Sequence, residues 1–453
     1  FKLKFNFWSK QPVFHFHNIW YWIISPKIIY PNGNFPINKY YVPFEVKTLK
    51  YDDANDIIKE QFFELIQTNY LISNHSKYNP PNKRIESYFK GHNNNCFISY
   101  IERNNSFVEY NKSENTFNTV NNSSIICALT SRPVDIYLSN GLKHFQMNYV
   151  DFLCTDKKER KKGNAPKVIY TYAIDSQKYK PNTCLFLFKR EGELTAIVPL
   201  ITYNSYMYSM KYWNKKELLH PFVVIEVNED NFQLIRNSLS HNVLNNKFNV
   251  VGISNISNII ELLKNKCIYF YALTIPNSNK IYGLYFFKNN DVYFTSTIDE
   301  NNNNGIDNGI DNDIDNGIDN GIKNNDNDKI KNNNNNNSRI KTNDNGIDNG
   351  IKNNNNNDKI ENKDRNIKSN KKTYMIDCFG SILFNDVFNV ERNREKFVGN
   401  TNINNIFTNE EINTLFEDGF YNACFSLSNE KKYSYINIEN ISDNYVFLKN
   451  IIL

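Results

Sequence analysis

The chain lacks the features that mark a secreted, disulfide-bonded protein or a membrane-spanning one. Its seven cysteines are scattered, without CxxC pairs or even spacing, and most stand among apolar residues. This pattern argues against a disulfide framework or a zinc site and predicts free thiols in a reducing compartment, the cytoplasm. No signal peptide is visible, and no apolar run approaches the roughly 20 residues that a membrane span needs. The closest approach to a span, 19–24, is cut off by Pro26 and Lys27 and predicts a buried or partner-facing segment.

A strong charge of either sign is also missing. The formal net charge is +5, and acidic and basic residues balance within 301–372, so the excess falls on the remainder. So mild an excess suits an anionic small ligand as well as nucleic acid and does not choose between them. Aromatic residues, in contrast, are plentiful, with 33 Phe and 29 Tyr. They are too many for a disordered chain and predict a sizeable aromatic core.

Residues 299–372 are reduced almost entirely to Asn, Asp, Gly, Ile and Lys, with GIDN units at 305–308, 309–312, 317–320 and 346–349. Isolated isoleucines in such a polar tract cannot offset the entropy of ordering, which favours disorder over a solenoid of short repeats. Strand-like segments, 292–295 and 373–376, flank the tract. We therefore interpret it as an insertion into a loop of a folded domain, where added length costs little.

The remaining pattern alternates between helix and strand periodicity. Apolar residues recur at three- and four-residue spacings in 51–75, which predicts a helix, and a second helix is expected from Pro166. The pattern repeats after residue 220 and predicts an α/β (α+β) fold of two related halves, 1–220 and 221–298 plus 373–453. Strands are expected at 96–100, 125–129, 135–138, 146–155, 183–188, 194–200, 222–226 and 268–274, with a helix at 229–240 and a hairpin at 281–296.

The most informative stretch is 148–169. An apolar strand-like run ending at Cys154 meets the basic loop 157–162, and Gly163 then leads into the second helix. A strand end, a cationic loop and a helix start together form a place to hold a pyrophosphate. Within it, 160–165 fits R-x-x-G-x-A, where small residues let the backbone close on a phosphate. Taken alone, the loop could equally be a solvated turn or a contact for nucleic acid.

This pattern resembles the coenzyme A loop of the GNAT acyltransferase superfamily. With the preceding D-F-L-C-T it is similar to the N-myristoyltransferases (glycylpeptide N-tetradecanoyltransferases), whose strand ends in N-F-L-C and is followed by K-K, R-x-K-R and A-P. Further segments agree in order with that family. In the first half, Phe7–Val13 resembles F-W-x-T-Q-P-V, Tyr41–Pro43 and Leu49–Tyr70 resemble Y-x-L-P and the family's first helix, and Ala128–Ile136 resembles I-S-A-I-P-A-x-I. Further along, Thr195-Ala196 resembles T-A-G, Tyr212–Asn214 resembles R-Y-W-H, and Gly419–Ala423 and Tyr445–Phe447 resemble the family's K-G-F-D-V-F-N-A-L and Y-Y-L-Y segments.

The resemblance implies a fold of two GNAT-like halves with a saddle-shaped mixed β-sheet flanked by helices. The half at 1–220 would bind acyl-CoA, and the half at 221–298 plus 373–453 would bind peptide. The implied activity transfers myristate from myristoyl-CoA to the N-terminal glycine amine of protein substrates. Myristoyl-CoA would be a co-substrate, with no permanently bound cofactor, no metal and no nucleic acid, and the enzyme would be a cytoplasmic monomer.

The resemblance also assigns roles to residues. The backbone N–H groups of Phe152 and Leu153 would form the oxyanion hole, and the C-terminal carboxylate of Leu453 would deprotonate the glycine amine. The acyl-CoA would be covered by Asn6, Phe7 and Trp8, lined by Leu153, Cys154 and Thr155, and held at its pyrophosphate by Lys161, Gly163, Asn164 and Ala165.

Departures from the family pattern leave a second interpretation open. Ile197 stands where the family has the glycine of T-A-G and would crowd the amine, and the segment 86–90 lacks the family's tryptophans. The chain also stops six residues after Phe447, sooner than the family does. A catalytically weak or inactive relative that binds acyl-CoA or peptide is the alternative to an active acyltransferase.

Two other candidate sites are weaker. Cys154 could be a nucleophile, since a thiol near cations has a lowered pKa, but no histidine stands in an obvious pairing with it. His15 and His17 alternate as in a strand and could share a metal, yet no carboxylate or cysteine accompanies them. We expect all three side chains to pack or to line a pocket.

Overall fold

The coordinates are a computed structural model of the chain. The predicted insertion at 299–372 lies outside the described residues, apart from Lys372 at its end, and Asn6, Thr195, Ala196 and Leu453 lie outside them too. The structure describes residues 7–23, 35–71, 76–111, 116–138, 143–179, 185–189, 197–240 without 201 and 203, 244, 248, 250–295, 372–384, 408–429 and 431–440.

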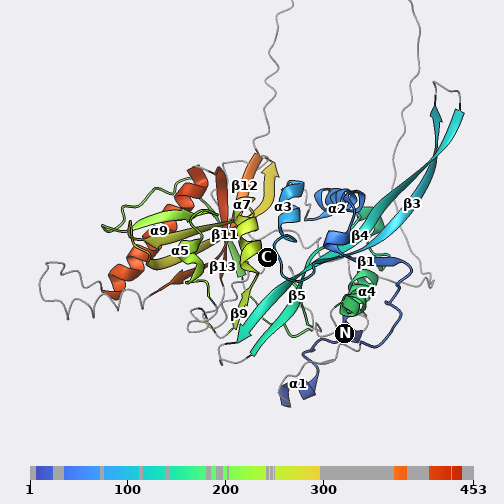
Figure 1. The fold of residues 1–453 in the computed structure, drawn as a ribbon, viewed down its shortest axis with the longest axis horizontal. Helices are drawn as coiled ribbons and strands as arrows, with labels where there is room; N and C mark the ends of the chain where they lie inside the picture. Colours follow the sequence, from blue (N-terminus) through green and yellow to red (C-terminus); the bar gives the residue numbers. More distant parts are fainter. Residues whose placement is uncertain are drawn as a thin grey trace, which may run out of the picture. The chain divides into compact units, whose positions relative to one another are not determined.

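The described strands form two mixed sheets (Figure 1). The first has six strands in the order β1-β3-β4-β5-β6, with β9 also paired to β4. Its neighbours are antiparallel except β5 and β6, which are parallel. The strands are β1 (Val46–Lys50), β3 (Phe97–Asn111), β4 (Thr116–Leu138), β5 (Lys143–Thr155), β6 (Phe186–Leu187) and β9 (Val250–Ile253).

The second sheet has seven strands in the order β7-β13-β12-β11-β10-β8, with β2 paired to β11. Only β12 and β13 run parallel. The strands are β2 (Ser76–Tyr78), β7 (Asn204–Ser209), β8 (Val223–Val227), β10 (Ile268–Thr274), β11 (Ile281–Thr295), β12 (Lys372–Leu383) and β13 (Tyr433–Asn440).

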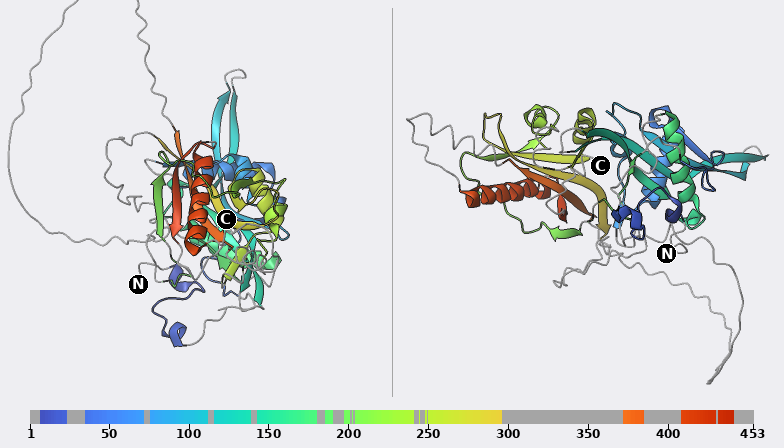
Figure 2. Two further views of the ribbon diagram at one scale, coloured as in Figure 1. Left: turned by 90° about the vertical axis from the view of Figure 1, so that its left-hand side faces the viewer. Right: turned by 90° about the horizontal axis from the view of Figure 1, so that it is seen from below.

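Helices cover the faces of both sheets (Figure 2). In the first sheet, α2 packs on the face that carries Ala128 and Cys154, and α4 packs on the face that carries Cys127 and Leu129. In the second sheet, α9 covers one face, and α5 and α7 cover the other. The helices are α1 (Ile19–Ile23), α2 (Asp56–Asn69), α3 (Asn82–Ser87), α4 (Asn164–Tyr179), α5 (Gln233–Arg236), α7 (Ile256–Lys264) and α9 (Asn409–Asn429), with short 3-10 turns η1 (Trp8–Lys10), η2 (Tyr51–Asp53) and η3 (Lys157–Glu159).

Helix α2 shows how the local sequence sets its packing. Asn55 caps its start, because the side-chain oxygen accepts a hydrogen bond of 2.9 Å from the backbone N–H of Ile58. Phe62 and Ile66 lie one turn apart and are both fully buried against β4 and β5. The three- and four-residue spacing therefore predicted this helix correctly.

Strand β10 is buried on both faces and lies inside the second sheet, between β11 and the edge strand β8. Side chains of a strand alternate between faces, and here the even-numbered Phe270 and Ala272 belong to one apolar cluster while Tyr269, Tyr271 and Leu273 belong to another. The first cluster also contains residues of α2 and β5 from the first sheet. One apolar core is thus shared by the two sheets.

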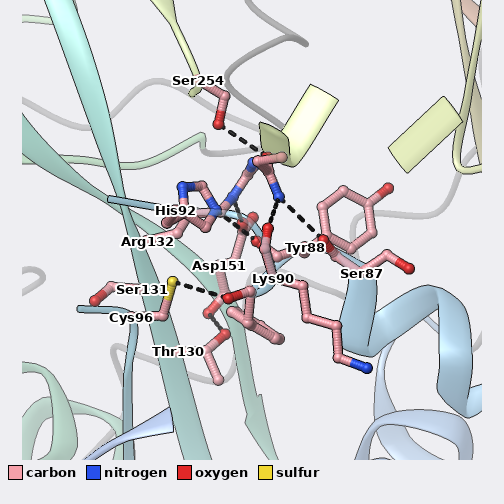
Figure 3. A network of polar contacts seen from close by, with 12 residues as sticks. Ser87, Tyr88, Lys90, His92, Cys96, Thr130, Ser131, Arg132, Asp151 and Ser254 are labelled. Atoms are coloured by element: carbon pink, nitrogen blue, oxygen red, sulfur yellow. Dashed lines mark hydrogen bonds and ion pairs between the residues drawn. The ribbon is translucent and has the colours of Figure 1, made fainter. Parts of the chain in front are cut away.

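Strand pairing between distant parts of the chain and buried polar contacts accompany this shared core. β2 pairs with β11, and β9 pairs with β4, so each sheet takes one strand from a distant part of the chain. Helices α3 and α7 are joined by the buried Asn258, whose amide donates to the carbonyl oxygens of Ser87 at 3.0 Å and Lys90 at 2.7 Å (Figure 3). All described residues fall in one compact unit.

The predicted insertion joins two strands that are hydrogen-bonded neighbours. β11 and β12 run antiparallel, and Thr295 pairs with Lys372 at the end of their ladder. The folded chain therefore closes across the insertion, as the strand-like flanks predicted, and only a loop between adjacent strand ends has to accommodate it.

The α/β class with mixed sheets and flanking helices is confirmed, while some elements differ from expectation. The segment predicted as a hairpin at 281–296 is one strand, because its irregularity at Asn289–Tyr293 shifts the register without reversing the chain. The helix expected at 229–240 is only Gln233–Arg236. Among the described helices, none is long and apolar enough to cross a bilayer.

Gly419 tests the packing of α9 on the second sheet. A Cβ there would lie 2.2 Å from the hydroxyl of Tyr285, which donates a 2.7 Å hydrogen bond to the carbonyl of Phe416. We expect Gly419→Ala to destabilise the fold by about 1–3 kcal/mol in chemical denaturation, because this well-packed contact must shift.

Gly380→Ala is the matched control, since a Cβ there meets only the Phe286 ring at 3.8 Å. Adding Tyr285→Phe to Gly419→Ala should recover part of the loss, because the nearest clashing atom is removed. Equal unfolding midpoints for the Gly419 and Gly380 variants would show that α9 does not pack as described.

Candidate active site

The strand β5 is interrupted where the oxyanion hole was predicted. Cys154 pairs with Ala128 and Asp151 with Thr130, so Phe152 and Leu153 together oppose a single residue of β4. This is a β-bulge. Phe152 has a φ of 47°, a left-handed conformation that is unusual for a bulky side chain and that recurs at functional sites. The bulge takes both residues out of the regular ladder.

The neighbouring strand β6 has already separated from β5 at this point. The two strands pair only at Asn148 with Phe186 and at Tyr149 with Leu187. Beyond Tyr149, no described residue of β6 continues the ladder, so Phe152 and Leu153 have no strand partner on either side within the described chain. Both residues therefore lie at the point where the strands diverge, outside the regular pairing of the sheet.

The basic loop after β5 is held by ion pairs to one buried carboxylate, Glu159, whose partners Arg103 and Lys162 are partly exposed. Glu159 is buried and accepts hydrogen bonds from both Arg103 and Lys162, the latter at 3.0 Å. The hydrogen bonds from Arg103 lower the pKa of the Glu159 carboxyl. Arg160 donates to the carbonyl of Asn69, the last residue of α2, at 2.8 Å. The loop is thus tied to β3 and α2, while Lys161 remains exposed.

Two residues with a left-handed backbone conformation connect the loop to the first turn of α4. Lys161 has a φ of 64° and Gly163 a φ of 79°, and nothing lies within 4 Å of where a Cβ on Gly163 would be. A helix leaves its first N–H groups without an intrahelical acceptor. Here those donors belong to Gly163, Asn164 and Ala165, because Pro166 has none. The strand end, loop and helix start that the sequence predicted are thus present together, the arrangement in which helix N-termini of other proteins hold anions.

The predicted cover residues pack on the other half of α4. Phe7 and Trp8 are buried with Tyr170 in one aromatic cluster, and the Trp8 ring stacks on Phe188 just after β6, at 5.4 Å between centroids. Ile197 packs against the same cluster. The structure therefore brings this segment close to α4 and the end of β6. Asn6 lies outside the described residues.

The three lining residues do not point the same way. Leu153 packs in the cluster on the α4 side, whereas the Cys154 thiol is buried on the α2 side and donates to the carbonyl of Leu65 at 3.8 Å. Burial raises the pKa of Cys154 to about 12, so the thiol is not a nucleophile at neutral pH. The Thr155 hydroxyl lies 3.1 Å from the Cys127 thiol.

Sequence reasoning missed a cationic cluster beside the bulge. Arg132 on β4 is fully buried and donates from Nε to Asp151 at 2.7 Å, next to Phe152 (Figure 3). Its guanidinium also lies over the ring of Tyr88, at 5.2 Å from the centroid. The Nζ of Lys288 on β11 lies over the same ring, at 5.7 Å from the centroid. A charged residue inside an otherwise strand-like apolar pattern was the available signal.

Comparisons with known proteins establish the fold. No family model matches the chain, and no curated protein matches its sequence. Among solved structures, Saccharomyces cerevisiae N-myristoyltransferase with bound myristoyl-CoA aligns over 98% of this chain and 88% of its own, with a TM-score of 0.52 and 13% identity. A second structure of that yeast enzyme with myristoyl-CoA gives a TM-score of 0.51 and 12% identity over 98% and 84% of the two chains. At this identity the likeness shows a shared fold.

His92 provides a pH test of the packing beside Arg132. Burial lowers the pKa of His92 to about 4, and Arg132 adds to this, against the effect of the 3.0 Å hydrogen bond between Nε2 and the Tyr88 carbonyl. The folded-state pKa lies below the unfolded value of about 6.5, so stability is lost as pH falls from about 6.5 to about 4. The loss is at most about 3 kcal/mol.

His92→Gln should flatten the fall in the free energy of unfolding between pH 7 and pH 4, measured by urea denaturation. His144→Gln is the control, since that ring is exposed. The account is wrong if the free energy of unfolding of both variants falls with decreasing pH as steeply as that of the wild type.

Proposed function

We propose that the chain is an acyl-CoA-dependent N-acyltransferase that transfers myristate from myristoyl-CoA to the N-terminal glycine amine of proteins. The observation that carries the proposal is the bulge at Phe152, which lies in the strand that leads directly into the anion-binding start of α4. The thioester oxygen, which gains negative charge during attack, and the anionic pyrophosphate would each meet backbone N–H groups.

In this proposal the N–H groups of Gly163, Asn164 and Ala165 bind the pyrophosphate of coenzyme A, and Lys161 supplies a point charge. Left-handed backbone at Lys161 and Gly163 supports such close approach, because no side chain blocks the phosphate at the glycine. Phe7 and Trp8 would cover the acyl chain from the α4 side.

The chemistry is direct attack without an acyl-enzyme. The amine nitrogen forms a bond to the thioester carbon, and the carbonyl oxygen takes negative charge that the N–H groups of Phe152 and Leu153 stabilise. Such preorganised donors contribute on the order of 3–4 kcal/mol. The C–S bond then breaks, and the coenzyme A thiolate takes up a proton. The family resemblance assigns the removal of the amine proton to the C-terminal carboxylate of Leu453. We propose that the enzyme acts as a cytoplasmic monomer.

A second candidate function is binding without turnover. Its support is Ile197, a branched side chain packed against the Phe7 cluster, where the family pattern has glycine. The two functions share the acyl-CoA site and differ only in whether the amine reaches the thioester.

Lys161 tests the acyl-CoA site. We expect Lys161→Ala to weaken myristoyl-CoA binding in isothermal titration calorimetry by about tenfold, or ~1.4 kcal/mol, because a cation beside the pyrophosphate is lost. Lys167→Ala is the matched control on the same helix, where the side chain already pairs with Glu45 at 2.5 Å. Failure of the wild-type chain to bind myristoyl-CoA would remove both candidate functions.

Turnover separates the two candidates. We expect the wild-type chain, supplied with myristoyl-CoA and a peptide beginning with glycine, to release coenzyme A and form an amide that mass spectrometry detects. The same peptide with an acetylated N-terminus should give none, because its nitrogen has no available lone pair. Saturable binding of myristoyl-CoA without product would leave the non-catalytic binder.

A further inference from the structure

Helix α1 exposes large apolar side chains to solvent. Ile19 is 69% exposed, Trp20 67% and Ile23 68%, and Phe16, just before the helix, is 46% exposed. Ile19 and Ile23 lie one helical turn apart, on the same face, with Trp20 beside them. Single exposed apolar residues are ordinary, but several in one short segment form a patch that marks an interaction site. Of the two expectations for 19–24, buried or partner-facing, the exposed side chains leave the second.

The base of α1 is attached to the body of the protein. His15 forms a β-bridge with Ile197, and the backbone N–H of Asn18 donates to the carbonyl of His15 at 2.9 Å. The side-chain oxygen of Asn18 in turn accepts from the N–H of Trp20 at 3.1 Å. Ile197 also packs against the cluster that contains Phe7. These contacts hold the turn that leads into α1, so the exposed helix stands on a fixed base beside that cluster.

The sequence around α1 carries charge of one sign only. Residues 1–44 contain five lysines and no aspartate or glutamate, so this segment alone accounts for the formal net charge of +5 of the whole chain. Among its described residues, Lys10 and Lys39 are exposed. Basic segments beside an apolar anchor are attracted to the negative surface of a membrane that contains anionic lipids. The charge therefore indicates an anionic partner.

The residue types of α1 favour a lipid surface among anionic partners. Trp and Tyr concentrate at the boundary between lipid headgroups and acyl chains, and aliphatic side chains enter the apolar layer below. A nucleic acid would stack its bases on aromatic rings but would gain nothing from the two exposed isoleucines. With five residues, α1 is far shorter than the roughly 20 that a membrane span needs. It suits a helix that lies in the membrane interface.

We propose that α1 and the basic segment around it dock the protein onto an anionic lipid bilayer. Ile19, Trp20 and Ile23 enter the interface, and the lysines of 1–44 stay at the level of the anionic headgroups. The bilayer then lies beside the Phe7 cluster, which the proposed function places over the acyl chain. The docking itself needs neither myristoyl-CoA nor acyl transfer, so it does not rest on that function.

The experiment measures co-sedimentation of the full chain with vesicles of phosphatidylcholine alone, or of phosphatidylcholine with about 30% phosphatidylserine. Wild type is compared with the double variant Ile19→Ser/Ile23→Ser and with the single variant Trp20→Ser. The matched control is Ile57→Ser/Ile256→Ser, because these isoleucines are also exposed on helices, at 67% and 39%. Unfolding midpoints in urea are measured for all four proteins, and we expect them to agree because no buried side chain is changed.

Wild type should bind the anionic vesicles at least about tenfold more strongly than the neutral ones, and added salt should reduce this preference. Ile19→Ser/Ile23→Ser should weaken binding to anionic vesicles by about tenfold, because two apolar side chains no longer leave water on docking. Trp20→Ser should act in the same direction. Ile57→Ser/Ile256→Ser should bind as the wild type does.

The inference is overturned if wild type fails to bind anionic vesicles, binds neutral ones equally well, or binds them no better than the two α1 variants do. Binding of single-stranded RNA that the α1 variants lose, without vesicle binding, would assign the patch to nucleic acid. A dimer that the α1 variants dissociate, again without vesicle binding, would assign it to a second copy of the chain.

Myristoyl-CoA binding by the same four proteins keeps this failure separate from that of the proposed function. A chain that binds myristoyl-CoA but no vesicle contradicts only the docking of α1. A chain that binds anionic vesicles through α1 but does not bind myristoyl-CoA contradicts only the proposed function.

Discussion

The break in the β5 ladder at Phe152 is the constraint on which the proposed chemistry depends. A regular strand would use the N–H groups of Phe152 and Leu153 for pairing. The bulge against β4 and the early end of the β6 pairing leave both residues outside the regular pairing in the described structure. The left-handed φ of Phe152 is a local cost. It is offset by the burial of the Phe152 ring among Phe62, Tyr70, Tyr88 and Phe89.

The loop that follows β5 leads to the start of α4 and is held in place by its own charged residues. Glu159 pairs with Arg103 and Lys162, and Arg160 donates to the end of α2, so two of the loop's basic residues hold the loop itself in place. Lys161 is left exposed beside Gly163. A charge run that could have been a solvated turn thus contains two cations that hold the loop, Arg160 and Lys162, besides lysines that face solvent, of which Lys161 stands next to the helix start. On β4, Arg132 is likewise a structural cation, because it is fully buried and ion-paired with Asp151.

Sequence reasoning predicted the elements whose signals are local. The spacing of Phe62 and Ile66 predicted α2, and the glycine-containing loop predicted the start of α4, because capping and periodicity act within a few residues. It failed where long-range pairing decides. The segment 281–296 reads as two short strands, yet pairing with β10 and β12 holds it as one. The register that places Arg132 opposite Tyr149 is likewise set by a partner strand, so the local sequence shows a charged residue within a strand-like pattern but not which residues it contacts.

Hydrogen–deuterium exchange in the presence of myristoyl-CoA tests the central claim most directly, because it reports on the backbone N–H groups themselves. The account predicts that saturating myristoyl-CoA slows exchange in 152–155 and 163–165, with no change in the remote edge strand β7. Protection confined to other segments, with Phe152, Leu153 and the start of α4 exchanging as in the free protein, would contradict it.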